Sequence, residues 1–116
     1  FVAQLVTLQH EDCGACLQIA VNLAQNDGVE ASLIRAVLDR DKNALSEEMA
    51  DVYDFTRFVI DVTADDGALR ETLRKRYGER GLIELAYAIA SSQIPPTVKR
   101  VLGYATSCTK VDITIT

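Results

Sequence analysis

The chain has 116 residues, of which 48% are hydrophobic and 25% charged, the composition of an ordinary globular protein with one core. A net charge of −5 and a pI near 4.8 exclude a general nucleic-acid binder, because affinity for phosphate backbones needs clustered lysine and arginine. No apolar run approaches the ~20 residues that span a bilayer, no signal-peptide pattern is present, and three cysteines do not make the framework typical of secreted proteins. We therefore expect one cytoplasmic domain over residues 1–116, either processed or part of a longer protein, since the chain starts at Phe1.

The first part of the chain has apolar residues at helical spacing in three segments. Residues 1–9 are typical of the end of a helix. Asp12 is a suitable N-cap for a helix over 13–26, because a short carboxylate accepts a hydrogen bond from an unpaired backbone N–H. Gly28 is expected to end that helix, and a short helix over 30–39 follows. The apolar stripe predicted for the helix over 13–26 consists of Cys16, Ile19, Ala20, Leu23 and Ala24.

The middle of the chain predicts two more helices. Ser46 is the expected N-cap of a long helix that reaches about Val62, and the two glutamates after Ser46 suit the positive end of its dipole. A short amphipathic helix over 68–78 should end at Gly78.

The last part of the chain is the most apolar. Residues 82–90 are nearly all apolar, so their helix is expected to be the most buried one. Pro95 and Pro96 should interrupt the helical pattern before a last helix over 96–106, because a residue before proline is pushed out of helical conformation. The tail 110–116 alternates like a strand without a partner strand, so we interpret it as an extended arm or a disordered end. The expected fold class is all-α, with six or seven helices.

Cys13 and Cys16 form a CxxC motif in the first turn of a predicted helix. A spacing of three places both sulfurs on one side of a helical turn, where they can close a disulfide with little backbone movement. Unpaired N–H groups and the helix dipole favour the reactive thiolate there, whereas the negative charges of Glu11 and Asp12 disfavour it.

Two other interpretations of the cysteines stay open. Cysteine is a good small core residue, and Cys16 lies on the apolar stripe. A metal site would use the spacing His10-x2-Cys13-x2-Cys16 with Cys108 as a fourth ligand, but structural zinc sites usually draw on two paired knuckles and the chain has one. We therefore expect no metal and no cofactor.

An all-α chain in which CxxC opens a helix before "GVEASLIRAVL" resembles the carboxymuconolactone decarboxylase and alkylhydroperoxidase D-like family. The stretch 1–38 resembles the family's core helix, CxxC helix and following short helix, and "RYGERGLIELAYAIASSQIPPTVKRVLGYATSC" resembles later helices of uncharacterised members. The resemblance implies an alkylhydroperoxidase D-like domain, a redox-active pair at Cys13 and Cys16 that reduces peroxides, and a trimer or hexamer.

Redox-active members also carry a glutamate about twelve residues before the first cysteine and a histidine four after the second. With a bridging water, these groups form a proton relay that activates the second cysteine. Here the glutamate position is Phe1 and the histidine position is Ala20, so both relay groups are missing. Peroxidase activity that depends on this relay is therefore in doubt, although disulfide exchange needs only accessible thiols and a suitable potential.

Three other side chains are candidates for an accessory role. His10 could act as the missing base, since histidine titrates near neutral pH, but it also suits a solvated helix end. Glu11 adjoins the motif, and Glu84 lies in the apolar segment 82–90, where a carboxylate needs a partner such as Arg80 or Arg100. Cys108 is either inert or a resolving thiol.

The sequence thus favours a CxxC thiol–disulfide oxidoreductase, with a peroxide or disulfide as substrate and a dithiol protein or small thiol as reductant. We expect neither nucleic acid nor membrane as a partner, and the apolar helical faces fit a homo-oligomer. The rival interpretation is a non-catalytic helical oligomerisation or binding module that has lost the relay.

Overall fold

A computed structural model describes residues 1–12, 14–62, 67–103 and 113 of the chain. Within these residues the fold contains only helices, namely α1 (Val2–His10), α2 (Gly14–Asn26), α3 (Ala31–Leu38), the 3-10 turn η1 (Lys42–Ala44), α4 (Glu47–Ile60) and α5 (Ala68–Leu102). The expected all-α class is confirmed, with five α-helices in the described part of the chain in place of the six or seven expected. The expectations for Cys13, Cys108 and the tail lie outside the described residues, except at Ile113, which packs against the core.

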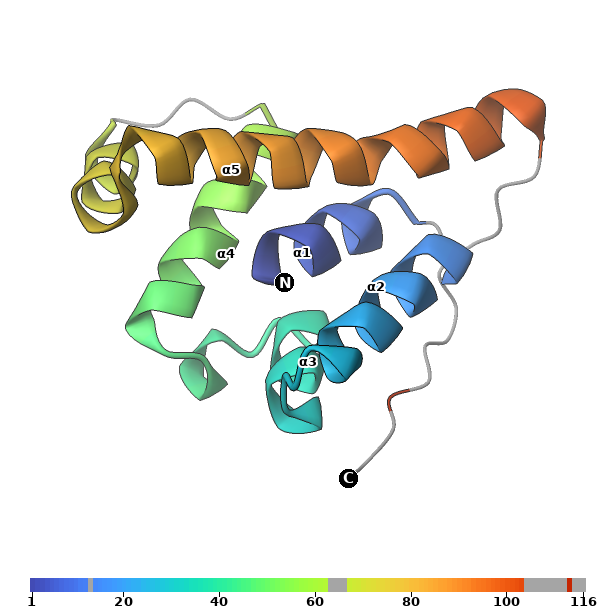
Figure 1. The fold of residues 1–116 in the computed structure, drawn as a ribbon, viewed down its shortest axis with the longest axis horizontal. Coiled ribbons are helices and arrows are strands. Elements are labelled where there is room, and N and C mark those ends of the chain that lie inside the picture. Colours follow the sequence, from blue (N-terminus) through green and yellow to red (C-terminus); the bar gives the residue numbers. More distant parts are fainter. Residues whose placement is uncertain (13, 63–66, 104–112, 114–116) are drawn as a thin grey trace.

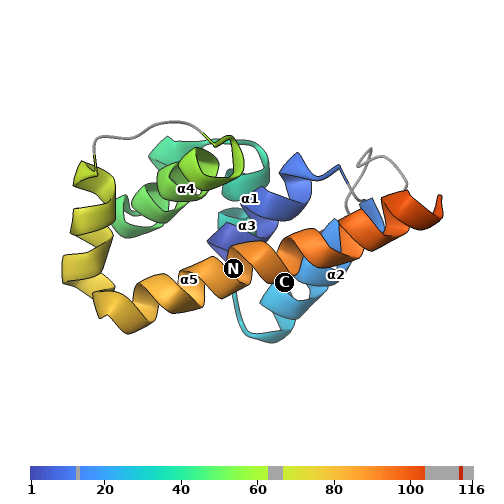
Figure 2. The ribbon, with the colours of Figure 1, turned by 90° about the horizontal axis from the view of Figure 1, so that it is seen from above.

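Helix α1 is the centre of the molecule. It packs against α2, α3, α4 and α5, which surround it in both views (Figures 1 and 2). The fully buried residues Leu5 and Thr7 lie on it, and the Thr7 hydroxyl donates to the Ala3 carbonyl at 2.7 Å. Gln9 donates its side-chain amide to the Leu38 carbonyl at 2.8 Å, which ties α1 to the end of α3. The core therefore forms around the first helix of the chain.

Several helix ends lie where local chemistry predicted them. Ser46 caps α4, since its Oγ accepts a hydrogen bond from the Met49 amide at 3.2 Å. Gly28 follows α2 in a left-handed conformation with φ 91°, as expected for a glycine that ends a helix.

Helix α2 presents a different face to the core from the one predicted. Cys16, Ala20 and Ala24 are buried as expected, together with Leu17 and Val21. Ile19 and Leu23 were predicted to be buried and are instead 59% and 57% exposed. The buried stripe is thus rotated by about one residue toward Leu17 and Val21, which belong to the core cluster that α1 and α3 also form.

Helix α5 confirms the expected break at Gly78 and corrects the expected break at the prolines. The helix expected over 68–78 does end at Gly78, whose φ of 75° and ψ of 177° are non-helical, so α5 consists of two helices joined at a kink. The apolar segment 82–90 and the helix expected over 96–106 are instead one continuous helix as far as Leu102. The prolines do not interrupt it: Pro96 is fully buried, and the buried Ser92 donates its hydroxyl to the Ala88 carbonyl at 2.6 Å. Packing of this segment against α1 thus outweighs the local preference of the proline pair.

The segment 82–90 is also not the most buried helix. Only Ile89 is buried there, while Ile83 and Tyr87 are 55% and 72% exposed. The part of α5 after the kink at Gly78, which we call its long arm, lies along one side of the molecule. Only one face of this arm therefore reaches the core (Figures 1 and 2).

Candidate functional site

Cys16 lies at the wall of a cavity where α1, α2 and α5 meet. The Cys16 side chain is only 6% exposed, and the cavity beside it has a volume of about 310 Å³. The walls are mostly apolar, and Lys99 supplies the cationic group. The lining residues are Gln4 and Leu8 of α1, Cys16, Ile19, Ala20 and Leu23 of α2, and Ser91, Ser92, Pro95 and Lys99 of α5.

Cys13 and Cys108 lie outside the described residues, so the predicted Cys13–Cys16 pair is not tested there. Within residues 1–12, 14–62, 67–103 and 113, no three histidine, cysteine or acidic side chains gather in the manner of a metal site.

Glu11 is held by the far end of the chain. The Arg100 guanidinium donates from Nη2 to the Glu11 carboxylate at 2.5 Å and from Nη1 to the Glu11 backbone carbonyl at 2.9 Å. The Glu11 side chain is 14% exposed, so this pair is well shielded on the carboxylate side. Arg100 therefore offsets the negative charge that Glu11 brings next to the CxxC motif, and it fixes the connection between α1 and α2.

His10 faces a different part of the molecule. Its Nε2 lies 3.4 Å from Oδ1 of Asp61 at the end of α4, and Arg57 contacts the other oxygen of Asp61 at 3.1 Å. His10 is not among the residues that line the cavity at Cys16. Of the two accessory candidates next to the motif, the structure therefore brings Glu11, and not His10, into contact with α5.

Glu84 lies on the solvent side of α5. Its side chain is 72% exposed, and Oε1 lies 3.7 Å from Nε of Arg80, one turn earlier. It does not line the cavity at Cys16, which α5 reaches from Ser91 onward. Of the two partners expected for Glu84, the structure shows Arg80.

The two positions of the missing relay differ in their surroundings. Ala20 lines the cavity beside Cys16, so a side chain placed there would enter it. Phe1 instead packs against the hydrophobic core. Gln4, one turn after Phe1 on α1, lines the same cavity and places a polar group there that no sequence pattern indicated.

Neither Lys99 at the cavity nor the contact that Arg100 makes with Glu11 is predicted by the sequence. Both lie more than 80 residues after the motif, and no local pattern relates the two segments. The basic pair at 99–100 in the last turn of a helix was the one available signal, and it is common at helix ends.

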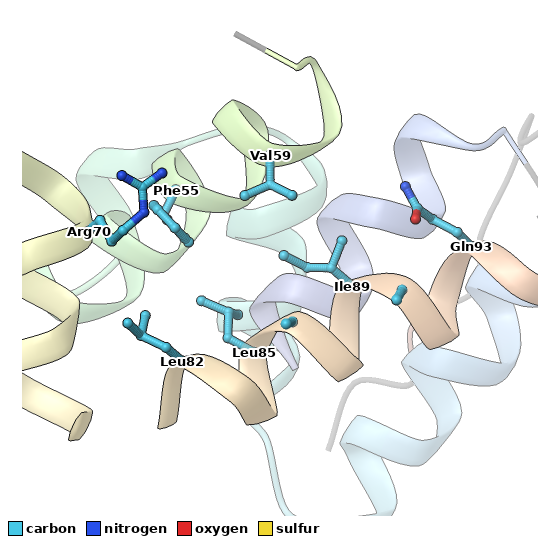
Figure 3. Close-up of a pocket in the computed structure, with 9 residues that line it drawn as sticks. Phe55, Val59, Arg70, Leu82, Leu85, Ile89 and Gln93 are labelled. Carbon is cyan, nitrogen blue, oxygen red and sulfur yellow. The ribbon is translucent and has the colours of Figure 1, made fainter. Parts of the chain in front are cut away.

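A second cavity lies on the other side of α5, against α4 (Figure 3). Its volume is about 380 Å³, and it is lined by apolar side chains with Arg70 and Gln93 as its polar groups. The Arg70 guanidinium lies 5.7 Å from the centre of the Phe55 ring, a cation–π distance. The other lining residues are Val59, Leu82, Leu85, Ala86, Ile89 and Ala90.

Compared with known proteins, the chain matches no family model, no curated protein and no solved structure. None of the helices in the described ranges combines the length and apolar character that crossing a membrane requires.

Proposed function

We propose that this protein is a thiol–disulfide oxidoreductase of the alkylhydroperoxidase D-like type, which acts through Cys13 and Cys16 and reduces peroxides or disulfides. The observation that carries the proposal is the position of Cys16, whose sulfur borders an apolar cavity formed by three helices. The cavity has room for a small peroxide or for the disulfide of a small thiol.

The chemistry requires two thiols and no cofactor. One thiolate attacks the peroxide oxygen, which gives a sulfenic acid and releases an alcohol or water. The second thiol then displaces water from the sulfenic acid and closes the Cys13–Cys16 disulfide. A dithiol protein or a small thiol reduces this disulfide again by exchange.

Two cations favour the thiolate. Arg100 neutralises Glu11, and Lys99 lies at the cavity that Cys16 borders. Cationic groups near a cysteine raise the fraction of reactive thiolate at neutral pH.

The decisive experiment starts from fully reduced protein treated with hydrogen peroxide or an organic peroxide. Trypsin separates residues 1–35, which hold Cys13 and Cys16, from residues 101–110, which hold Cys108. We expect a loss of two hydrogens within peptide 1–35, reversed by dithiothreitol. A cross-link between the two peptides, or no oxidation at all, would contradict the proposal.

The missing relay predicts slow peroxide turnover, and the cavity suggests how to restore it. Ala20→His places an imidazole next to Cys16, and Gln4→Glu adds a carboxylate to the same cavity. We expect little change from Ala20→His alone, and a gain of about a hundredfold from the double variant, which is typical of general-base catalysis. Gln4→Glu alone is the matched control, and peroxide consumption in a coupled assay is the measurement. Fast turnover of the wild type would show that another base operates.

The second candidate function is a non-catalytic binding module, which the cavity against α4 favours. That cavity presents an apolar wall with a guanidinium at Arg70 (Figure 3). If this is the function, small apolar ligands should displace a fluorescent hydrophobic dye from this cavity and so change its emission. The double variant Cys13→Ser with Cys16→Ser should leave this binding unchanged.

A further inference from the structure

The long arm of α5 carries an exposed apolar ridge, formed by Ile83, Tyr87, Ala90, Ile94, Val98 and Val101. All six residues are exposed, with fractions of 72% at Tyr87, 60% at Ile94 and 80% at Val101. Their spacings of three and four residues place them along one side of the helix over a length of about 27 Å. Isolated exposed apolar residues need no explanation, but a continuous row of this length marks an interaction surface.

The charges around this ridge are confined to its ends. Between Leu85 and Val98 the sequence holds no charged residue. Glu84, which pairs with Arg80, lies at the start of the ridge, and Lys99, which is half-buried at the cavity of Cys16, lies near its end. The midpoint between these two residues falls between Ser91 and Ser92, which is also the middle of the ridge.

We infer that a second copy of this chain packs on the ridge, with the two α5 helices antiparallel and a two-fold axis near Ser91 and Ser92. Antiparallel pairing about this point sets Glu84 of each copy beside Lys99 of the other, twice in the dimer. Parallel pairing would instead set like charges together at both ends. The three-and-four spacing of the ridge is the one by which two helices interlock their side chains.

The same pairing covers the cavity at Cys16. Ser91, Pro95 and Lys99 of α5 line that cavity, and so do the exposed side chains of Ile19 and Leu23. A second copy on the ridge would reach this side of α5, shield the two α2 side chains and narrow the access to Cys16. The inference does not depend on the redox function, because it concerns only the apolar surface and its charges.

The first test is the mass of the reduced protein by sedimentation velocity or light scattering. We expect a particle of twice 12.7 kDa for the wild type. Ile94→Glu and Tyr87→Glu should each give a monomer with unchanged helix content, because both side chains are exposed in the single chain. Val62→Glu is the matched control, since Val62 is 89% exposed at the end of α4 and lies off the ridge. A monomeric wild type, a trimer, or an assembly that Ile94→Glu leaves intact would overturn the inference.

The second test addresses the direction of the pairing. Glu84→Lys and Lys99→Glu should each weaken the dimer by about threefold to tenfold, because each brings like charges together. The double variant should restore the wild-type dissociation constant, since it exchanges the two charges. If the double variant binds no better than the single variants, the antiparallel arrangement is wrong.

Discussion

At the scale of single residues, the side chain of Arg100 connects the two ends of the described chain. It reaches across 89 residues to hold both the carboxylate and the backbone carbonyl of Glu11. Glu11 is two residues before Cys13, and its carboxylate is the more shielded partner of the pair. The arginine therefore has two effects: it fixes the connection into α2, and it neutralises a charge that would otherwise oppose thiolate formation.

Replacing Arg100 by methionine separates these effects from simple packing. Arg100→Met keeps the aliphatic stem but leaves the shielded Glu11 carboxylate without its donor, so the free energy of unfolding should fall by about 1–2 kcal/mol. The alkylation rate of the reduced CxxC pair at neutral pH should fall by about threefold to tenfold, since less thiolate forms. Peptide mapping after brief labelling measures this rate for Cys13 and Cys16 separately, and the buried Cys16 should react later than Cys13.

The matched control for this variant is Arg80→Met. Arg80 belongs to the same helix and also pairs with a glutamate, Glu84, but both side chains are exposed. Arg80→Met should change the unfolding free energy by no more than about a few tenths of a kcal/mol, and it should leave the labelling rate unchanged. Equal effects of the two variants would show that helix charge alone, and not the contact with Glu11, matters.

At the scale of the element, α5 shows a conflict between local preference and packing. Pro95 and Pro96 remove two backbone donors from the helix interior, yet the helix continues to Leu102. Pro96 is fully buried, whereas Pro95 is exposed at the edge of the cavity. Only Pro96 therefore contributes core packing in return for the lost hydrogen bond.

This difference predicts opposite effects of two alanine substitutions. Pro95→Ala restores a helical donor at little cost in packing, so it should raise the free energy of unfolding by about 1–3 kcal/mol. Pro96→Ala restores a donor but removes buried ring atoms, so its gain should be smaller or absent. Urea denaturation of the two variants and the wild type gives the comparison. A destabilising Pro95→Ala would mean that the rigid proline itself supports the cavity wall.

The connection before α4 supplies a pH-dependent contribution to stability. Lys42 of η1 donates to Asp54 of α4 at 2.9 Å, and this hydrogen bond and charge raise the pKa of Lys42 above its usual 10.5. Because the pKa is raised on folding, the stabilisation is fully present below pH 10.5 and is lost as the pH rises through the folded value. Both side chains are partly exposed, so the contribution should stay below about 1 kcal/mol.

A comparison of the wild type with Lys42→Met measures this contribution. The difference in unfolding free energy should be constant between pH 7 and pH 9 and should vanish at strongly alkaline pH. A difference that instead grows with pH would show that the lysine is not stabilised by Asp54.

At the scale of the whole molecule, local chemistry predicted helix ends better than helix surroundings. Ser46 caps α4 through its own side chain, and Gly28 ends α2 through its own backbone conformation. These helix ends were predicted correctly because each depends on a single residue. The burial of Ile19, Ile83 and Tyr87 was wrong, because a stripe at helical spacing suits a core and a surface for another molecule equally well.

The candidate site was predictable only from its own helix. Cys16 was singled out from the CxxC spacing alone, but its neighbours come from α1 and α5. Lys99 and Arg100 could not have been found, because their position depends on α5 continuing through a proline pair and packing against α1. The tertiary packing that decides both facts is not encoded in any local window.

The central position of α1 predicts that the long arm of α5 is essential to the fold. Ile89, Ser92 and Pro96 are its buried residues, and α5 packs on α1. A chain that ends at Tyr77 should keep part of its helix content but lose near-ultraviolet circular dichroism and cooperative unfolding, and it should bind hydrophobic dyes. A sharp thermal transition in this shortened chain would show that α1 to α4 form a core without α5.

The same central helix makes the order of synthesis matter. Of the helices described here, α1 leaves the ribosome first, apolar on most of its surface, while the arm that covers it comes last. Contacts between segments almost ninety residues apart close large loops, and such closure slows folding. Until the part of α5 after Gly78 is made, the nascent chain exposes the apolar residues of this central helix, so its folding is most open to aggregation, and to help from chaperones, just before synthesis of that part is complete.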